Sequence, residues 1–421
     1  VSRSKRAYAQ ANLVEYDEHD PIRGKAVIQP HGNRYLICNP PAMPLNTQEL
    51  DEVAELPYMR EPHPVYDSMG GVPAIEEVRF SVIHNRGCFG ACKFCSLAFH
   101  QGRMVTSRSH ESLLREVTAL TQHPGFKGYI HDVGGPTANF RRPSCKKQLK
   151  HGLCKHRDCL APTPCPNLDA DHSDYLALLR KLRAIPGVKK VFIRSGIRFD
   201  YLLKDPKGEF FADLVKYHIS GQLKVAPEHC VGHVLDAMGK PHIGAYEKFR
   251  DKYQRLNQKY GKKQFLVPYL MSSHPGSTLG DAIAMAQRNA ERNGLTNMDF
   301  LCEDTFELLP RLEKEGHPYD FIILDPPAFT KARRTVESAM RGYKEINYRA
   351  MKLLPRGGYL ATASCSHFAT EELFIKMLRS AAKDAHRQLR QIEVRQQAPD
   401  HPILWGVPET NYLKFFLFQV I

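Results

Sequence analysis

Hydrophobic positions between residues 77 and 280 alternate between strand-like and helix-like spacing. Short β-rich runs predict strands, and longer runs with apolar residues three or four apart predict amphipathic helices. The predicted strands lie at 77–84, 128–133, 190–194, 222–226 and 264–271. The predicted helices lie at 109–122, 173–184, 209–217 and 243–259. Strands that alternate with helices in this way predict a parallel sheet with right-handed crossovers, here an incomplete (β/α) barrel.

Two other regions flank this pattern. Residues 1–76 are polar and proline-rich, so we expect an irregular lead-in with a short strand at Arg34–Cys38. Residues 281–421 resume the alternation, with a helix from Asp281, strands at 298–302, 321–324 and 359–363, and a helix at 305–315. We expect this third region to form a partial, doubly wound, Rossmann-like sheet that binds ligands at the carboxyl ends of its strands. The predicted fold class is α/β.

The basic character of the chain is uneven. Its formal net charge is +14. Residues 281–421 contain 19 Lys and Arg against 18 Asp and Glu, which leaves 40 against 27 in residues 1–280. This excess makes RNA a candidate partner. A solvated basic surface explains it equally well, because no RNA-binding motif accompanies it.

The absence of a signal peptide and of any apolar run long enough to span a bilayer predicts a protein with no membrane association. Eleven cysteines in a chain without secretory features indicate metal ligation in a reducing compartment. We therefore expect a cytoplasmic protein.

Three of these cysteines follow the first predicted strand on one short loop, as Cys88, Cys92 and Cys95 in the stretch RGCFGACKFCS. Three thiolates on one loop can hold an iron–sulfur cube and leave its fourth iron open for a substrate or cofactor. The alternative is a structural zinc site. Zinc prefers four ligands in paired sets, and no fourth ligand stands at such spacing here.

A second cysteine set lies in the insertion at 141–166, on a lysine-rich loop between two predicted strands. Four cysteines within a short loop indicate a metal site, either zinc or a second iron–sulfur cluster, or else unliganded thiols. The members of this set are Cys145, Cys154, Cys159 and Cys165.

Polar and small residues follow several predicted strands. Gly134 and Gly135 come directly after the second strand, and Ser195 and Arg198 follow the third. In a strand–loop–helix barrel, function collects at the carboxyl ends of the strands, so these residues are expected to bind a cofactor. A plain turn, or caps and loop residues without function, is the alternative for each position.

The cysteine loop, with Phe94 before its last cysteine, resembles the signature of the radical SAM superfamily. From about residue 39 to 281 the chain resembles the YgiQ-type radical SAM proteins, through HDVGGPTANF, IRSGIRFD, LKVAPEHC, LVPYLMSSHPGS and the four-cysteine insertion. The resemblance implies a 4Fe–4S cluster on Cys88, Cys92 and Cys95 and S-adenosylmethionine as cofactor. Gly134 and Gly135 would then contact the methionine amino group. The cluster would draw electrons from a reductant of the flavodoxin or ferredoxin type, generating a 5′-deoxyadenosyl radical.

Residues 281–421 resemble the C-terminal part of class I methyltransferases of the RlmI type, which act on cytosine C5 of ribosomal RNA. The resemblance rests on DPP-x-F at 325–329, SCS at 364–366, and the stretches QAPDHP and YLK. It implies that Cys365 is the nucleophile, that Asp325 borders the base pocket and that Asp304 contacts the adenine of the methyl donor. The glycine-rich donor loop of that family has no counterpart before Asp281.

The sequence therefore predicts a join of two incomplete enzymes. The leading hypothesis is a radical SAM iron–sulfur enzyme. The alternatives are an rRNA cytosine-5 methyltransferase acting through the second half, and a metal-stapled RNA-binding protein without catalysis.

Overall fold

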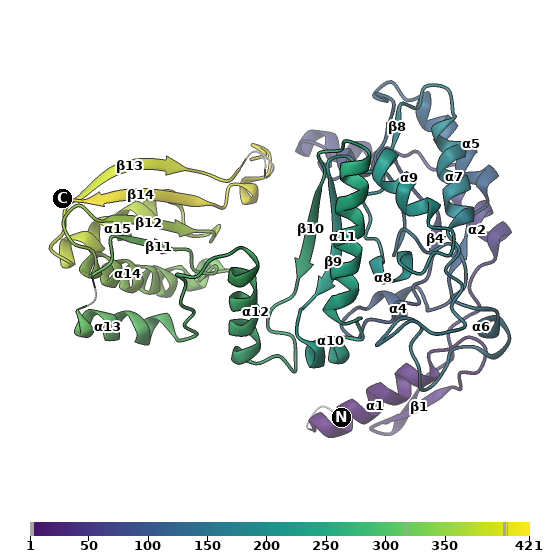
Figure 1. The fold of residues 1–421 in the computed structure, drawn as a ribbon, viewed down its shortest axis with the longest axis horizontal. Coiled ribbons are helices and arrows are strands. Elements are labelled where there is room, and N and C mark those ends of the chain that lie inside the picture. The colour runs from purple at the N-terminus through teal and green to yellow at the C-terminus, as the bar shows by residue number, and fades with distance from the viewer. Residues whose placement is uncertain (1–3, 317, 399–400, 402) are drawn as a thin grey trace. The chain divides into compact units, whose positions relative to one another are not determined.

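Two compact units make up the chain in the computed structural model, the first ending at Met298 and the second beginning at Asp299 (Figure 1). The structure describes residues 4–316, 318–398, 401 and 403–421, with only the backbone at residue 292. The predicted join at residue 281 lies inside helix α12 (Leu279–Arg292), which belongs to the first unit. The domain boundaries given by the sequence stay a prediction.

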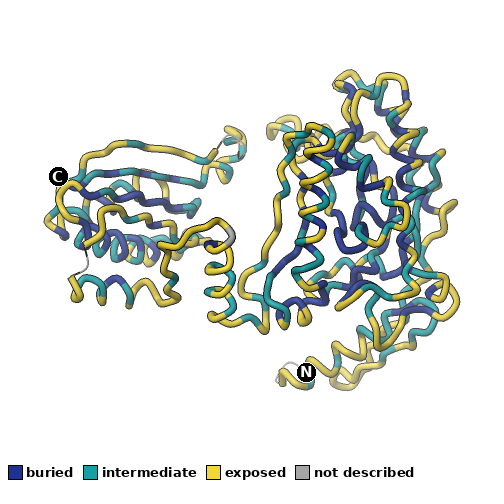
Figure 2. The backbone as a smooth tube through the Cα atoms, viewed as in Figure 1, coloured by how far each residue is buried: buried dark blue, intermediate teal, exposed yellow. Residues whose placement is uncertain are grey.

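The lead-in contains more regular structure than the sequence analysis expected. Strand β2 lies at the predicted Arg34–Cys38 and pairs in antiparallel fashion with β1 (Val27–His31). The helices of this region are α1 (Lys5–Glu18), α2 (Thr47–Ala54) and α3 (Ile75–Val78), with a 3-10 turn at Pro64–Met69. Ser4 and Asn46 cap α1 and α2, which supplies a partner for amide groups that a helix start leaves free. Helix α1 buries none of its residues, and Figure 2 shows a mixture of exposed and intermediate positions along it.

The first unit contains three parallel strand pairs among its described residues. They are β3 (Ser81–Ile83) with β7 (Asp132–Gly134), β6 (Tyr129–Ile130) with β8 (Lys190–Val191), and β9 (Gln222–Glu228) with β10 (Phe265–Leu270). A fourth, antiparallel pair joins β4 (Asn85–Arg86) to β5 (Thr106–Ser107). Parallel pairing is thus confirmed. These pairs are separate sheets, however, and in the described part of the chain they do not close into a barrel.

Helices cover these strands with their apolar stripes. The four helices predicted between residues 77 and 280 are confirmed within one residue at each end, as α5 (His110–Thr121), α7 (Ser173–Arg183), α9 (Glu209–Tyr217) and α11 (Ile243–Lys259). Shorter helices are α4 (Leu97–His100), α6 (Lys146–His151), α8 (Phe199–Leu202) and α10 (Gly232–Met238). The buried core includes Leu113, Leu178, Phe211 and Phe249. Of the helices described, none has the length and apolar character needed to cross a membrane.

A four-stranded sheet in the order β11-β12-β14-β13 organises the second unit. Its strands are β11 (Phe321–Leu324), β12 (Tyr359–Ser364), β13 (Leu389–Arg395) and β14 (Lys414–Val420). Only β11 and β12 run parallel, and the other two pairs are antiparallel. The helices are α13 (Thr305–Glu315), α14 (Val336–Leu353) and α15 (Glu371–Asp384). Strand β12 is buried almost throughout, and Tyr343, Phe374 and Phe416 fill the core beside it.

The strand predicted at 298–302 is wrong, because none of these described residues pairs with another strand. A strand forms only where a neighbour completes its hydrogen-bond ladder. Strand β11 is the edge of the sheet and is paired with β12 alone. Ile323 of this strand is 69% exposed.

Candidate functional site

The loop that carries Cys88, Cys92 and Cys95 begins directly after β4. Its Cys88 amide donates to the Gly102 carbonyl at 3.0 Å, and its Cys95 amide donates to the Cys92 carbonyl at 3.1 Å. Gly87 adopts φ +84°, and a Cβ there would collide with the Met104 carbonyl. Glycine is therefore required at the entrance of the loop, because it alone combines this dihedral with no side chain.

Arg198, predicted as a cofactor-binding residue, contacts this loop. Its Nη1 donates to Cys92 Sγ at 3.2 Å, and its Nε donates to Asp200 Oδ1 at 2.7 Å. Burial by itself would lower the pKa of Arg198, but the Asp200 carboxylate and the Cys92 thiol outweigh burial and raise it. Burial also raises the pKa of the Cys88 thiol, whose sulfur lies 3.5 Å from Thr137 Oγ1.

The chemistry of these residues fits an iron–sulfur cluster with a bound cofactor. The loop offers three thiols, and Arg198 brings a permanent positive charge to them. Arg198 Nη2 and Asp200 Oδ2 are buried without hydrogen-bond partners, as expected for groups that await a polar ligand. Still, the part of the chain that the structure describes contains no group of three His, Cys, Asp or Glu side chains arranged to hold a metal ion.

Gly134 and Gly135 lie at the end of β7 with no space for side chains. A Cβ at Gly134 would collide with Ser195 Oγ and with the Asp132 carboxylate, and one at Gly135 would collide with Asn85 Oδ1. Asp132 accepts hydrogen bonds from the Ser195 hydroxyl and from the backbone amides of Arg194 and Ser195. The structure therefore brings Gly134, Gly135 and Ser195 together around Asp132. They line a cavity of about 640 Å³ with Asn85, Arg86 and Arg194.

Glu228 and Lys240 are buried near Arg198, and neither is among the site residues predicted from the sequence. Lys240 Nζ lies 3.7 Å from Glu228 Oε1, and Glu228 Oε2 has no hydrogen-bond partner. Glu228 also adopts φ +71°, an unfavourable backbone conformation for a residue with a side chain. Burial raises the pKa of Glu228, and it lowers that of Lys240 together with the Arg198 charge. Glu228 follows the strand predicted at 222–226, and this position is the signal that could have identified it, whereas nothing in the sequence points to Lys240.

Phe94, the aromatic residue of the cysteine loop, is 37% exposed and makes an edge contact with His274 at 6.1 Å between ring centroids. Among the contacts of the described residues, none joins Phe94 to Arg198 or to the two glycines. Its role in cofactor binding stays a prediction.

The second cysteine set lies next to the first through two contacts. Lys93, within the first loop, pairs with Asp158 at 3.0 Å, and Asp158 directly precedes Cys159. Cys88 and Cys159 also pack against one small apolar cluster that includes Phe89 and Phe140. Burial and then the neighbouring thiols of Cys145, Cys154 and Cys165 raise the pKa of Cys159 to about 11. The four thiols are thus close enough to interact, whereas metal binding by them stays a prediction.

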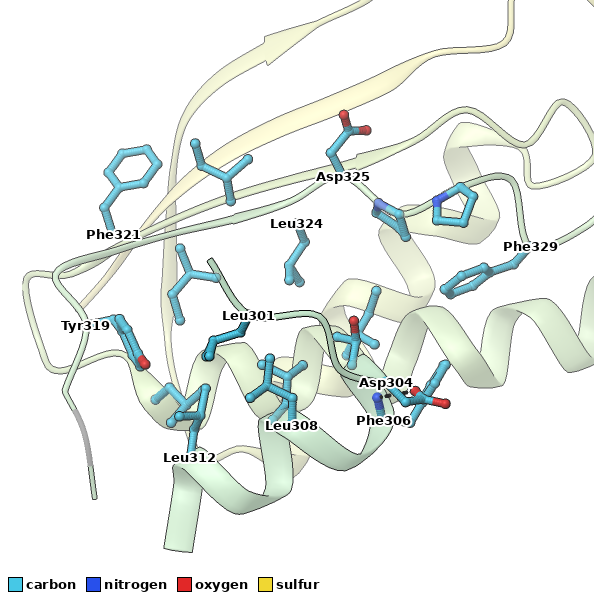
Figure 3. Close-up of a pocket in the computed structure, with 18 residues that line it drawn as sticks. Leu301, Asp304, Phe306, Leu308, Leu312, Tyr319, Phe321, Leu324, Asp325 and Phe329 are labelled. Atoms are coloured by element: carbon cyan, nitrogen blue, oxygen red, sulfur yellow. Dashed lines mark hydrogen bonds between the residues drawn. The ribbon is translucent and has the colours of Figure 1, made fainter. Parts of the chain in front are cut away.

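Within the second unit, Asp304 and Asp325 line the same cavity of about 670 Å³ (Figure 3). Asp304 caps α13, since its Oδ1 accepts from the Phe306 amide at 2.8 Å, and Asp325 follows the last residue of β11. Most of the lining is apolar, from Leu301, Leu308, Leu312, Tyr319 and Phe329. The roles that the resemblance implies, Asp304 at the donor adenine and Asp325 at the base pocket, stay predictions.

Cys365 follows β12 and does not line that cavity. Lys414 Nζ donates to the carbonyl of the next residue, Ser366, at 2.7 Å, and Ser366 Oγ lies 2.8 Å from the Tyr343 hydroxyl. Burial lowers the pKa of Lys414, while the nearby Cys365 raises it. The sequence did not single out Lys414, although this residue lies in the YLK stretch that contributes to the resemblance.

Comparison with known proteins connects the first unit to radical SAM proteins. Residues 1–81 match the profile of the family described as Radical SAM N-terminal. A UPF0313 protein of Clostridium perfringens is 54% identical over 287 residues, which are 68% of this chain and 43% of that protein. A UPF0313 protein of Clostridium botulinum is 58% identical over 287 residues, covering 68% of this chain and 45% of the relative. The chain thus spans less than half of the length of these curated relatives.

Solved structures show much weaker likeness. The crystal structure of SMU.776 complexed with SAH has a TM-score of 0.30 and 16% identity, and covers 51% of this chain and 49% of that one. NSun6 from Pyrococcus horikoshii with SFG has a TM-score of 0.26 and 15% identity, and covers 50% of each chain. At these scores neither likeness identifies the fold. The family match, the relatives and the division into two units together describe a two-part protein with a radical SAM-related N-terminal region.

Proposed function

We propose that the first unit is a radical SAM enzyme whose cluster is held by Cys88, Cys92 and Cys95 and whose cofactor is S-adenosylmethionine. When bound, a reduced 4Fe–4S cluster supplies the electron that cleaves this cofactor to a 5′-deoxyadenosyl radical. The observation that carries the proposal is the guanidinium of Arg198, which donates to Cys92 Sγ and keeps a second buried nitrogen without a partner. In this proposal the separate parallel strand pairs belong to an incomplete barrel.

The residues around the loop have distinct roles in this proposal. Arg198 offsets the negative charge of thiolates and offers its free N–H to an anionic group of the cofactor. Asp132 accepts hydrogen bonds from the Ser195 hydroxyl and from the Ser195 amide, which follows the third predicted strand, and so holds this segment in place. Gly134 and Gly135 let the backbone approach a ligand closely, because neither position admits a Cβ. A flavodoxin- or ferredoxin-type reductant, RNA as partner and a cytoplasmic location belong to the same proposal.

Spectroscopy of the full chain, reconstituted without oxygen, tests the cluster. We expect an electron paramagnetic resonance signal that shifts when S-adenosylmethionine is added. Cys92→Ala should abolish reductive cofactor cleavage, because two thiolates cannot hold the cube with one iron open. Cys302→Ala is the matched control, since this exposed cysteine lies outside both sets. Full cleavage activity in Cys92→Ala would overturn the assignment.

A second candidate function, RNA cytosine-5 methylation, has one observation in its favour, the cavity that Asp304 and Asp325 share. We nevertheless propose that the full chain does not carry out this reaction. Methyl transfer requires a donor held in near-attack geometry, and positioning of this kind contributes on the order of 7–11 kcal/mol in well-oriented model systems. Only Asp304 is available as the donor contact that the resemblance implies.

The corresponding assay measures methyl transfer to ribosomal RNA by the full chain and by Cys365→Ala. We expect no transfer in either case. Transfer that disappears only in Cys365→Ala would contradict this expectation and favour the methyltransferase.

A further inference from the structure

A cavity of about 710 Å³ lies beside helix α5 in the first unit. Residues from several separate elements line it, including the starts of α2 and α5, strand β5 and the side chains of Arg108, Arg141 and Lys181. No cysteine of either set is among the lining residues. The cavity is therefore separate from the site proposed for the cluster.

Two helix N-termini open into this cavity. Asn46 and Thr47 come from the start of α2, and Ser109 and His110 come from the start of α5. The first amide groups of a helix have no partner within it, and its N-terminal end carries a partial positive charge. The Ser109 amide donates to Asp51 Oδ1 at 3.0 Å, which joins the start of α5 to the second turn of α2. Residues from both helix starts thus line the same cavity.

The side chain of Arg141 supplies an independent indication of a ligand. It is only 7% exposed, and its Nε donates to Asp174 Oδ2 at 2.6 Å while its Nη2 donates to the Arg108 carbonyl at 3.0 Å. The remaining nitrogen, Nη1, is buried and has no hydrogen-bond partner. The Nε of Arg108, whose side chain is 9% exposed, is buried without a partner as well. Because an unpaired buried donor costs free energy, such groups indicate a site where a ligand accepts their hydrogen bonds.

Acidic groups at the cavity leave this positive character in place. Asp174 is engaged by Arg141, and His110 Nε2 lies 3.1 Å from its other oxygen. Glu111 is exposed, as is Lys181. Arg108 in turn is paired with Glu116. Among the described lining residues, the buried side-chain polar atoms without a hydrogen-bond partner are nitrogens of Arg108, Arg141 and His110.

We propose that this cavity binds a phosphate group, carried either by a free nucleotide or by an RNA backbone. Arginine nitrogens and helix N-termini are the groups that proteins use for phosphate, because they combine positive charge with directed N–H donors. The surrounding half of the chain is also the basic one, with 40 Lys and Arg against 27 Asp and Glu in residues 1–280. The site goes beyond the proposed radical chemistry and does not depend on it.

Calorimetry with the full chain tests the site, using inorganic phosphate, AMP and a short RNA oligonucleotide as probes. Arg141→Gln removes the buried guanidinium and is expected to weaken phosphate binding by about tenfold or more. Lys181→Ala changes an exposed rim residue and is expected to weaken it several-fold without affecting folding. Lys127→Ala, an exposed lysine outside the lining, is the matched control and should bind as the unchanged protein does. Circular dichroism verifies that each variant is folded.

The probes also distinguish the two sources. If phosphate and AMP bind as tightly as RNA does, and Lys181→Ala weakens the binding of phosphate and of AMP, the cavity is a site for a free nucleotide. If RNA binds much more tightly than phosphate and AMP do, and Lys181→Ala weakens its binding, the cavity is a site for an RNA backbone. The proposal is overturned if no probe binds saturably, if Lys127→Ala weakens binding as much as Lys181→Ala, or if Lys181→Ala leaves binding unchanged.

Discussion

Individual glycines in the first unit differ in the space that surrounds them. Gly134 is enclosed by Ser195 Oγ and the Asp132 carboxylate, while Gly244, in helix α11, has nothing within 4 Å of an added Cβ. The sequence pointed to Gly134 as a functional residue by its place after a strand. The collision partners explain in physical terms why glycine is required there.

At the residue scale we predict that Gly134→Ala lowers the free energy of unfolding by about 1–3 kcal/mol, the usual effect of overpacking. Gly244→Ala is the matched control. It should raise that free energy by about 0.4–1 kcal/mol, because alanine restricts the unfolded chain without a clash. Urea unfolding followed by far-ultraviolet circular dichroism measures both. Equal stability of the two variants would contradict the packing seen at Gly134.

At the scale of elements, the insertion at 141–166 is joined to the cysteine loop more closely than chain order suggests. The ion pair of Lys93 with Asp158 and the shared packing of Cys88 and Cys159 connect the two. Helix α6 is the one regular element described within the insertion, so most of this segment has no secondary structure to hold it. A metal bound by the four cysteines would stabilise such a segment, as structural zinc does in other small loops.

We therefore predict that protein with Cys88, Cys92 and Cys95 all changed to alanine still carries tightly bound zinc or iron. Elemental analysis after exhaustive dialysis measures the residual metal. Additional replacement of Cys145 and Cys159 by alanine should remove it, because two thiolates cannot complete a four-ligand site. A triple variant that retains no metal would count against the second site.

At the scale of the whole molecule, buried histidines make the stability of the first unit dependent on pH. Burial lowers the pKa of His84 to about 3 and that of His218 to about 4, from the usual 6.5. His218 Nδ1 lies 2.7 Å from the Val191 carbonyl, and His84 Nε2 lies 2.8 Å from the Ala138 carbonyl. Both rings are neutral in the folded protein at neutral pH, whereas in the unfolded chain they take up a proton as pH falls below 6.5.

Stability should therefore be complete above pH 6.5 and should fall as pH decreases from 6.5 toward 4, by about 1.4 kcal/mol per pH unit for each histidine. Urea midpoints at about pH 7.5 and about pH 5 measure this loss. His218→Asn keeps a donor near Val191 without a titrating ring, so its midpoint should depend less steeply on pH. An unchanged slope in this variant would exclude His218 as a source of the effect.

The sequence by itself determined the elements whose hydrophobic period is long and clear. Helices α5, α9 and α11 and strands β2 and β11 match their predicted positions because local periodicity and capping residues define them. Spacing also grouped Cys88, Cys92 and Cys95 on one loop and placed Gly134, Ser195 and Arg198 after strands. For the strand at 298–302 local pattern was insufficient, since a strand depends on a partner elsewhere in the chain.

Only the tertiary structure decided which distant side chains meet. Arg198 contacts Cys92 over 106 positions of chain, and Lys240 approaches Glu228 through the fold around α10. The same holds for Arg141, which lines a cavity together with the starts of α2 and α5. Such contacts arise from the packing of whole elements, and local sequence spacing contains no record of them. Chemistry-bearing residues could therefore be named from the sequence, whereas their partners could not.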